Sequence, residues 1–309
     1  MKRLFVLLLT LASLQAEPTA LSTPADAAKE AHLANINALL IFTSQDGLNT
    51  GLFHFTKVSV DMQIYNLPFI YHFDSYGDYN YFVVGNVGYS RVFASNDYVI
   101  PPNTRLTADS QLQTYTAGVG AGVRYHLKEE VDLLGGIEFI YSRSGVSIVQ
   151  KDGSITDPIE DFFNNSYNDN ISYKLFFESE YKPKMPYIEP YFKLGYKFYD
   201  TKSDFSYDKL TNFSTQSNVF WALAGLESRK LYTTPEGYVT LEGYLSANYL
   251  EGDVVKSVGF DNYVKLGGIG YFYLEDEESW VERFFLEVST ISGDGLEGYN
   301  IGLGFTINY

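Results

Sequence analysis

Residues 299–309 read "YNIGLGFTINY". The odd positions carry aromatic or aliphatic side chains, and the even positions carry Asn, Gly or Thr. Because successive side chains of a β-strand point to opposite faces, a strand here has one apolar face and one small, polar face. A water-soluble sandwich would bury the apolar face, whereas a transmembrane barrel would expose it to lipid. The remainder of the chain must decide between the two.

The composition excludes several classes of protein. The 309 residues carry a net charge of −16, which argues against nucleic acid as a partner. Cysteine is absent, which excludes a disulfide framework, a thiolate metal site and a cysteine-linked lipid anchor. Aromatic residues make up 17% of the chain, with 27 Tyr and 23 Phe, a high share for a soluble protein.

The first residues, "MKRLFVLLLTLASLQA", resemble a secretory signal. Lys2 and Arg3 precede a short apolar run, and Ala16 is the small residue that a signal peptidase requires. We predict that residues 1–16 are a signal peptide cleaved after passage through the Sec translocon. The alternative, an N-terminal membrane anchor, requires a longer apolar run. No later run approaches the ~20 apolar residues of a membrane helix, so the exported chain is soluble, surface-attached or a barrel.

Alternation of apolar and polar residues recurs along the whole chain in segments of about ten residues, which is typical of transmembrane barrels. Twelve such segments lie near residues 36–44, 61–74, 80–93, 112–127, 133–147, 169–182, 187–201, 215–230, 238–250, 258–274, 281–293 and 298–309. We predict an all-β fold, a twelve-stranded antiparallel transmembrane β-barrel formed by residues 36–309.

The connections between these segments alternate in length, as they do in outer-membrane barrels with short periplasmic turns and longer external loops. The expected external loops are 45–60, 94–111, 148–168 and 202–214, followed by two short ones at 251–257 and 294–297. Tyrosines gather at both ends of the segments, as expected for aromatic girdles at the two membrane surfaces.

The polar face of each segment predicts which charged residues face the lumen. The candidates are Arg124, Glu138, Lys174, Glu178, Glu180, Lys193, Lys197, Glu242, Lys265, Arg283 and Glu287. Since both signs occur, they can pair across a narrow barrel, and a wetted polar interior is favoured over a selectivity filter. Glycines on the same face, at 118, 120, 122, 302 and 304, would let a helix or an aromatic ring approach the wall.

Two stretches, "DMQIYNLPFIYHF" at 61–73 and "YNYFVVGNVGYSRV" at 79–92, carry a resemblance to the solitary, passenger-less autotransporter-type outer-membrane barrels of Gram-negative bacteria. The resemblance covers about residues 35–309. It implies location in the outer membrane and a helix in the lumen. Residues 17–35 are the expected leader, in which "TPADAAKEAHLAN" favours a short helix, with a disordered periplasmic leader as the alternative. Only about twenty residues separate the signal from the first expected strand, so secretion of a passenger does not carry over.

The alternating end of the chain also resembles the signal read by the barrel-assembly machinery during biogenesis. The residues that match it are Phe305, Ile307 and Tyr309. That signal usually ends in Phe, and Tyr309 stands in its place.

Sites for chemistry are few. The chain has four His, and none lies in a lipase-like stretch or at a metal-ligand spacing, so we expect no enzyme, cofactor or metal. Acidic residues within 148–168 could hold Ca²⁺ or bridge to lipopolysaccharide, although a solvated loop is favoured. The leading hypothesis is a monomeric, porin-like structural or narrow-pore protein surrounded by outer-membrane lipid and lipopolysaccharide. The alternatives are a surface-loop adhesin or receptor, and a barrel enzyme such as a lipase or protease.

Overall fold

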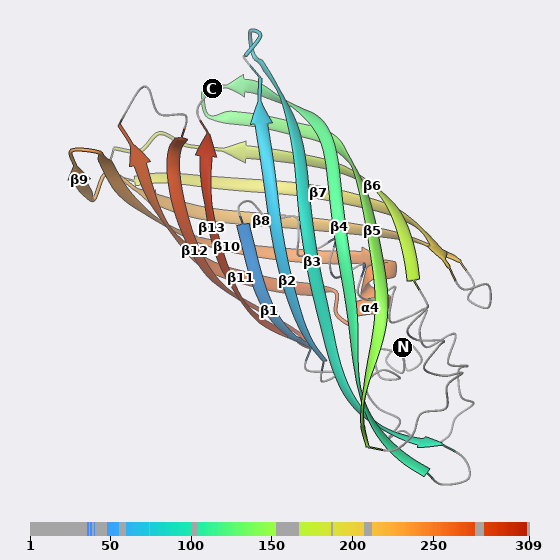
Figure 1. Ribbon diagram of the computed structural model, residues 1–309. Helices are drawn as coiled ribbons and strands as arrows, with labels where there is room; N and C mark the ends of the chain where they lie inside the picture. Colours follow the sequence, from blue (N-terminus) through green and yellow to red (C-terminus); the bar gives the residue numbers. More distant parts are fainter. Residues whose placement is uncertain are drawn as a thin grey trace.

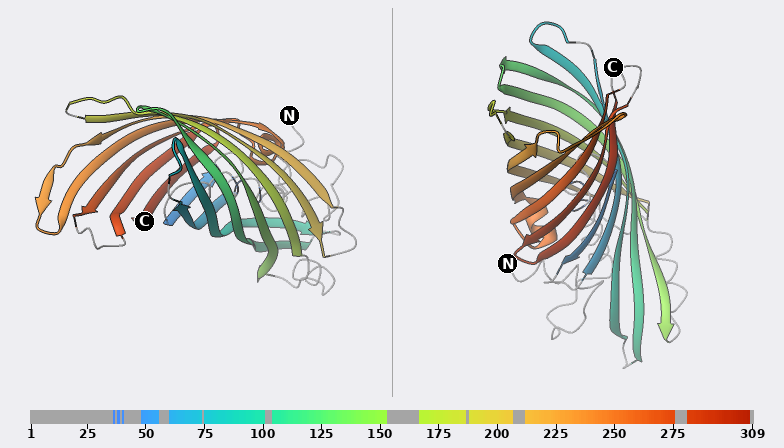
Figure 2. Two further views of the ribbon diagram at one scale, coloured as in Figure 1. Left: turned by 90° about the horizontal axis from the view of Figure 1, so that it is seen from above. Right: turned by 90° about the vertical axis from the view of Figure 1, so that its left-hand side faces the viewer.

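The computed structural model describes residues 36, 38, 40, 48–55, 60–73, 75–100, 104–152, 167–186, 188–206, 212–275 and 281–307. Twelve antiparallel strands form a closed, steeply tilted barrel in which each strand pairs with its neighbours in sequence and β1 pairs with β13 (Figures 1 and 2). The strands are β1 (Leu48–Phe55), β2 (Val60–His72), β3 (Tyr79–Ile100), β4 (Thr104–Lys128), β5 (Val131–Asp152), β6 (Tyr167–Tyr181), β7 (Ile188–Phe205), β8 (Phe213–Ser228), β10 (Gly237–Gly252), β11 (Asn262–Leu274), β12 (Val281–Gly293) and β13 (Leu296–Ile307). The predicted twelve-stranded barrel is confirmed.

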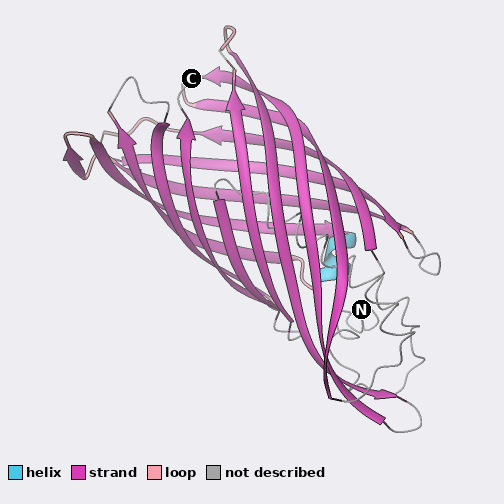
Figure 3. Ribbon diagram, viewed as in Figure 1, coloured by secondary structure: helices cyan, strands magenta, loops and turns pink. Residues whose placement is uncertain are grey.

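One short strand and one short helix accompany the barrel. β9 (Tyr232–Thr234) pairs only with β10, in a hairpin where a turn was expected. Helix α4 (Asp253–Val258) lies between β10 and β11; it begins in the expected loop 251–257 and ends one residue beyond it. Figure 3 shows α4 at the end of the barrel opposite to the C-terminus. We call that end the long-loop end, and the end with the tight β4–β5 connection at 129–130 the short-turn end.

The first strand lies elsewhere than the sequence predicts. Ile36, Ala38 and Leu40 are helical, so the strand expected at 36–44 is wrong. β1 instead lies within the expected loop 45–60, where Phe53 and Phe55 point inward. The apolar residues at 36, 38 and 40 suit a strand by their spacing, but all three are buried inside the barrel, where a helix satisfies its own backbone.

Three strands are longer than expected. β3 and β4 remain paired from Tyr79↔Tyr125 to Ile100↔Thr104, so most of the expected loop 94–111 is a hairpin. β5 likewise extends to Asp152. Backbone hydrogen bonds hold these extensions, and their polar sequence lacks the lipid-facing alternation from which strands were predicted.

The outer surface of the barrel is apolar. In the stretch 299–307, Tyr299, Ile301, Leu303 and Phe305 are at least half exposed, whereas Asn300 between them is 1% exposed. In water such a surface would be unstable, but in a bilayer it meets hydrocarbon. Among the described residues, no helix is long and apolar enough to cross a membrane.

Two leucines on neighbouring strands test which side chains face the lipid and which face the lumen. Leu245 of β10 points outward and is 51% exposed, and it pairs with Ala224 of β8. Leu223, the residue before Ala224, lines the lumen. Leu245→Arg should lower the free energy of unfolding by about 2–4 kcal/mol if the site lies near the midplane, because the cation enters hydrocarbon. Leu223→Arg is the matched control and should cost less. Urea unfolding in lipid vesicles measures both, and equal losses would contradict the assignment of faces.

Candidate functional site

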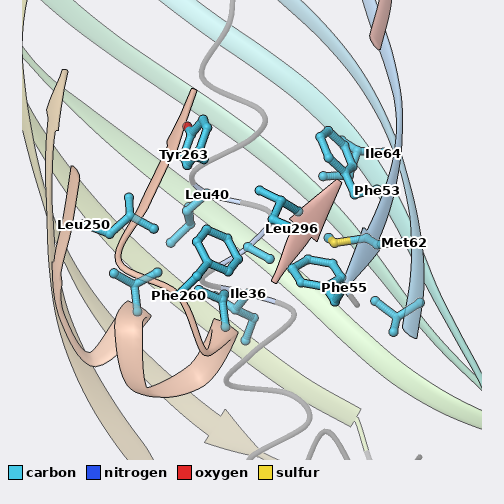
Figure 4. Packing of buried hydrophobic residues seen from close by; sticks show 14 of the residues in the cluster. Ile36, Leu40, Phe53, Phe55, Met62, Ile64, Leu250, Phe260, Tyr263 and Leu296 are labelled. Carbon is cyan, nitrogen blue, oxygen red and sulfur yellow. The ribbon is translucent and has the colours of Figure 1, made fainter. Parts of the chain in front are cut away.

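An apolar cluster fills the lumen at the long-loop end (Figure 4). Its centre consists of the helical residues Ile36, Ala38 and Leu40, which are 2–4% exposed, and we call these three residues the lumen plug. The Tyr199 hydroxyl of β7 donates a hydrogen bond of 3.2 Å to the carbonyl oxygen of Leu40. The surrounding residues are Phe53, Phe55, Met62, Ile64, Val92, Leu112, Ile140, Tyr199, Val219, Leu250, Val254, Val258, Phe260, Tyr263, Ile291 and Leu296.

Helix α4 packs against the same cluster through Val254 and Val258. It is held to β8 because the Gln216 amide donates to Asp253 Oδ2 at 3.0 Å and the Val254 amide donates to a serine hydroxyl of β8. Burial alone would raise the pKa of Asp253, but hydrogen bonds from Lys256 and from the Gln216 amide lower it below its ordinary value. The helix is therefore a fixed part of the long-loop end.

Beyond the cluster lies a cavity of about 1530 Å³, lined by both charged and apolar side chains, which we call the lumen chamber. Every charged residue that the sequence predicts to face the lumen is on its wall, from Arg124 on β4 to Glu287 on β12. Among the described residues that line it, seven are acidic and seven are basic. The wall thus has no excess of one sign that would select anions over cations.

Two ion pairs on the wall of the lumen chamber are deeply buried. Lys174 Nζ lies 2.8 Å from Glu138 Oε2, with side chains 12% and 3% exposed, and Asn86 donates a further hydrogen bond to this carboxylate. Lys265 Nζ lies 2.7 Å from Glu287 Oε1, with side chains 9% and 7% exposed. Such burial makes each carboxylate depend on its cation.

A third group is more open to the cavity. Lys193 Nζ lies 3.3 Å from both Glu178 and Glu180, and Lys182 also contacts Glu180, at 3.1 Å. Arg124 lies 3.8 Å from Asp132, near the short-turn end.

Tyrosines that the sequence reasoning missed supply hydrogen bonds to the carboxylates. Tyr191 and Tyr271 both donate to Glu242, and Tyr244 donates to Glu287. Tyr273 donates to Glu227 at 3.0 Å. Each of these tyrosines lies an even number of residues from an inward charged residue of its own strand. The same alternation would therefore have identified them as lumen-facing.

Glycines on the inner wall are covered by aromatic rings from the directly opposite residue of the neighbouring strand. A Cβ atom added at any of these glycines would overlap the ring. The pairs are Phe82 with Gly122, Phe176 with Gly136, Trp221 with Gly195, Tyr191 with Gly225, Tyr244 with Gly267, and Phe285 with Gly304. At residues 122 and 304 this agrees with the expectation that inward glycines let an aromatic ring approach the wall.

Other predicted features fall partly outside the described residues. Phe305 points outward and Ile307 pairs with Val281 at the end of β13, whereas Tyr309 lies outside the described residues, as do the signal peptide and the leader helix within 17–35. The assembly role of these residues stays a prediction.

The histidines form separate, simple contacts. His54 and His126 contact Asp61 and Asp132 at 2.8 and 2.6 Å, and His72 contacts an asparagine at 3.0 Å. His32 lies outside the described residues. Across the part of the chain that the structure describes, no group of three or more His, Cys, Asp or Glu side chains is placed to hold a metal ion.

Comparison with known proteins finds similarity in structure alone. No protein-family model matches the chain, and no curated protein matches it in sequence. Among solved structures, the translocator domain of autotransporter NalP from Neisseria meningitidis matches with a TM-score of 0.55 and 11% identity, over 92% of this chain and 98% of that one.

Two further translocators match similarly. The β-domain of the Bordetella autotransporter BrkA has a TM-score of 0.55 and 11% identity, over 84% of this chain and all of that one. The transport unit of autotransporter AIDA-I from Escherichia coli has a TM-score of 0.54 and 10% identity, over 94% of this chain and all of that one. The chain therefore has the fold of autotransporter translocator domains, a twelve-stranded outer-membrane β-barrel.

Proposed function

We propose that this protein is a monomeric barrel of a Gram-negative outer membrane with a structural or narrow-pore role. The observation that carries the proposal is the lumen plug, whose Ile36 and Leu40 are buried in apolar surroundings at the long-loop end. Water and ions cross an apolar, packed region poorly, so the barrel is expected to conduct little although its chamber is wet.

We also propose that the barrel works without a translocated passenger. An extended polypeptide that crossed the lumen would have to displace Ile36 and Leu40 and break the hydrogen bond from Tyr199 to Leu40. In such a barrel no residue is catalytic, and the balanced charges of the chamber serve to satisfy one another.

Single-channel recording in planar bilayers tests the role of the plug. The full chain should show small, infrequent openings. Removing residues 17–40 should raise the conductance several-fold, because the centre of the apolar cluster is lost. The double variant Ile36→Asp and Leu40→Asp keeps the chain length and should raise the frequency of openings, because two buried carboxylates disfavour the packed state.

Two controls make the recording decisive. Heat-modifiable migration in gels must show that each variant still forms a barrel. Ile301→Ser and Leu303→Ser, on the lipid face of β13, should leave the conductance unchanged. A conductance that is the same with and without residues 17–40 would overturn the proposed closure.

A further inference from the structure

The outward face of β3, β4 and β5, which run side by side, changes in the same order towards the long-loop end (Figure 1). On each strand the outward residues pass from apolar side chains through tyrosine to a polar side chain: Val87, Tyr89 and Arg91 on β3, Val119, Ala117, Tyr115 and Gln113 on β4, and Phe139, Tyr141 and Arg143 on β5. This is the order expected where hydrocarbon gives way to lipid head groups. The two arginines therefore lie at the depth of the head groups.

These arginines flank a pair of tyrosine rings. Tyr89 is directly opposite Tyr115, with ring centroids 4.9 Å apart, and Tyr115 is directly opposite Arg143. Arg91 lies on the same face, two residues beyond Tyr89. We call Arg91, Tyr89, Tyr115 and Arg143 the outer patch. Because Arg143 is two strands across and two residues along from Arg91, their Cα atoms are roughly 12 Å apart.

Both guanidiniums are accessible to an anion. Arg91 donates a hydrogen bond to the Tyr89 hydroxyl and lies 5.2 Å from the centroid of that ring, and among the described residues no carboxylate pairs with it. Arg143 Nε lies 3.6 Å from Asp169 Oδ1, with side chains 51% and 41% exposed. Such an exposed pair is weak because water screens it, so Asp169 neutralises Arg143 only in part.

The outer patch gathers positive charge on a chain whose net charge is −16. By contrast, Arg124 and Arg283 line the lumen, and Arg229 follows β8 at the short-turn end. Asp61 on β2 and Asp169 on β6 bound the patch, so the positive charge is confined to β3–β5. A protein of this net charge repels anions in general, and the patch is a local exception on its lipid-facing side.

We propose that the outer patch binds a diphosphorylated glycolipid of the lipid A type from the external leaflet, with one phosphate at each arginine. Such a lipid is a disaccharide with a phosphate on each sugar and with acyl chains below. A guanidinium binds phosphate through two parallel hydrogen bonds. The sugars lie over Tyr89 and Tyr115, between the two arginines, and the acyl chains follow the apolar residues Val87 and Val119.

Other occupants fit the outer patch less well. A phospholipid with a single phosphate would engage one arginine and leave the other without an anion. An acidic protein would reach the arginines but not the apolar residues beside them, of which Val87 and Val119 are each 57% exposed. The spacing of the arginines and the apolar surface below them together favour the diphosphorylated lipid.

Native mass spectrometry of the full chain in detergent tests the proposal with three added lipids. These are diphosphorylated lipid A, its monophosphorylated form with the same acyl chains, and phosphatidylglycerol. The diphosphorylated form should bind at least about tenfold more tightly than either of the others, because it alone makes charged hydrogen bonds at both arginines. Equal affinity for the one-phosphate and two-phosphate forms would overturn the proposal.

Arg91→Gln and Arg143→Gln should each weaken binding of diphosphorylated lipid A about tenfold and remove its advantage over the monophosphorylated form. Lys202→Gln is the matched control, because Lys202 is an exposed outward cation near the end of β7 that lies outside the patch. Its affinity should be unchanged. Heat-modifiable migration in gels confirms that each variant forms a barrel. A loss at Lys202 equal to the loss at the arginines would mean that the lipid responds to surface charge alone, and would overturn the proposal.

The inference rests on the proposed membrane location, with the long-loop end external, but not on the lumen plug. Removing residues 17–40 should therefore leave the affinity for lipid A unchanged even where it alters the conductance. A failed conductance experiment would leave the lipid result standing. Loss of lipid A binding in that truncated chain, in spite of a folded barrel, would place the lipid in the lumen and overturn the proposal.

Discussion

Replacing Lys265 with Met is expected to lower the free energy of unfolding of the barrel by about 3–5 kcal/mol, because it leaves Glu287 buried without a cation. The two side chains are 9% and 7% exposed, and Lys265 Nζ lies 2.7 Å from Glu287 Oε1. The hydrogen bond from Tyr244 to the same carboxylate remains, but it cannot neutralise the charge. Urea unfolding in lipid vesicles, followed by intrinsic fluorescence, measures the loss.

The double variant Lys265→Met and Glu287→Met should recover most of that stability, because no unpaired charge remains. Lys230→Met is the control. Lys230 pairs with Glu275 at the short-turn end, both are about half exposed, and its loss should change stability far less than the loss of Lys265. Equal losses at Lys265 and Lys230 would show that water screens the chamber pair as well as it screens a surface pair.

Leu296→Ala should cost about 2–5 kcal/mol, since it opens a cavity in the cluster around the lumen plug, where Leu296 is fully buried. Leu303→Ala on the same strand is the matched control. Leu303 points outward and is 52% exposed, and mobile lipid chains fill the space that its side chain leaves. We therefore expect a clearly smaller loss for Leu303→Ala. If the two variants lost similar amounts of stability in the same unfolding assay, the cluster would be loosely packed.

The fold was largely predictable from the sequence because lipid imposes a simple rule on a barrel. Each strand must be apolar on its outer face, and strands such as 169–182 show this alternation clearly, close to the observed β6 at Tyr167–Tyr181. The rule applies only at membrane depth. It therefore gave no indication of the paired extension of β3 and β4 to Ile100 and Thr104, which backbone hydrogen bonds hold.

The lumen plug was harder to predict, because the same rule treats inward residues as polar. Ile36, Ala38 and Leu40 matched a strand by spacing, and only their burial inside the barrel shows that they are something else. A usable signal was nevertheless present. Apolar residues such as Met62 and Ile291 occupy inward positions towards the long-loop ends of their strands, and they have no reason to be apolar unless another apolar segment covers them.

The pairing of charges within the chamber could not be read from the sequence. Parity indicates that Glu138 and Lys174 share a face, but it leaves open which strands adjoin at which register. Their contact depends on the β5–β6 register, in which Glu138 is directly opposite Lys174. Only a structure supplies that offset.

The rings that cover inner-wall glycines bear on how this register is chosen. Sliding one strand by two residues keeps every side chain on its own face, so alternation does not oppose such a slip. Tyr191 covers Gly225, and a slip of two residues would set its ring against Leu223 or Glu227, whose side chains need the same space. Gly136, Gly195, Gly225 and Gly267 thus each distinguish one offset from those two residues away, whereas Gly122 and Gly304 have a second glycine two residues away on one side. The distinction is made within a pair of adjacent strands, so it can act before the barrel closes.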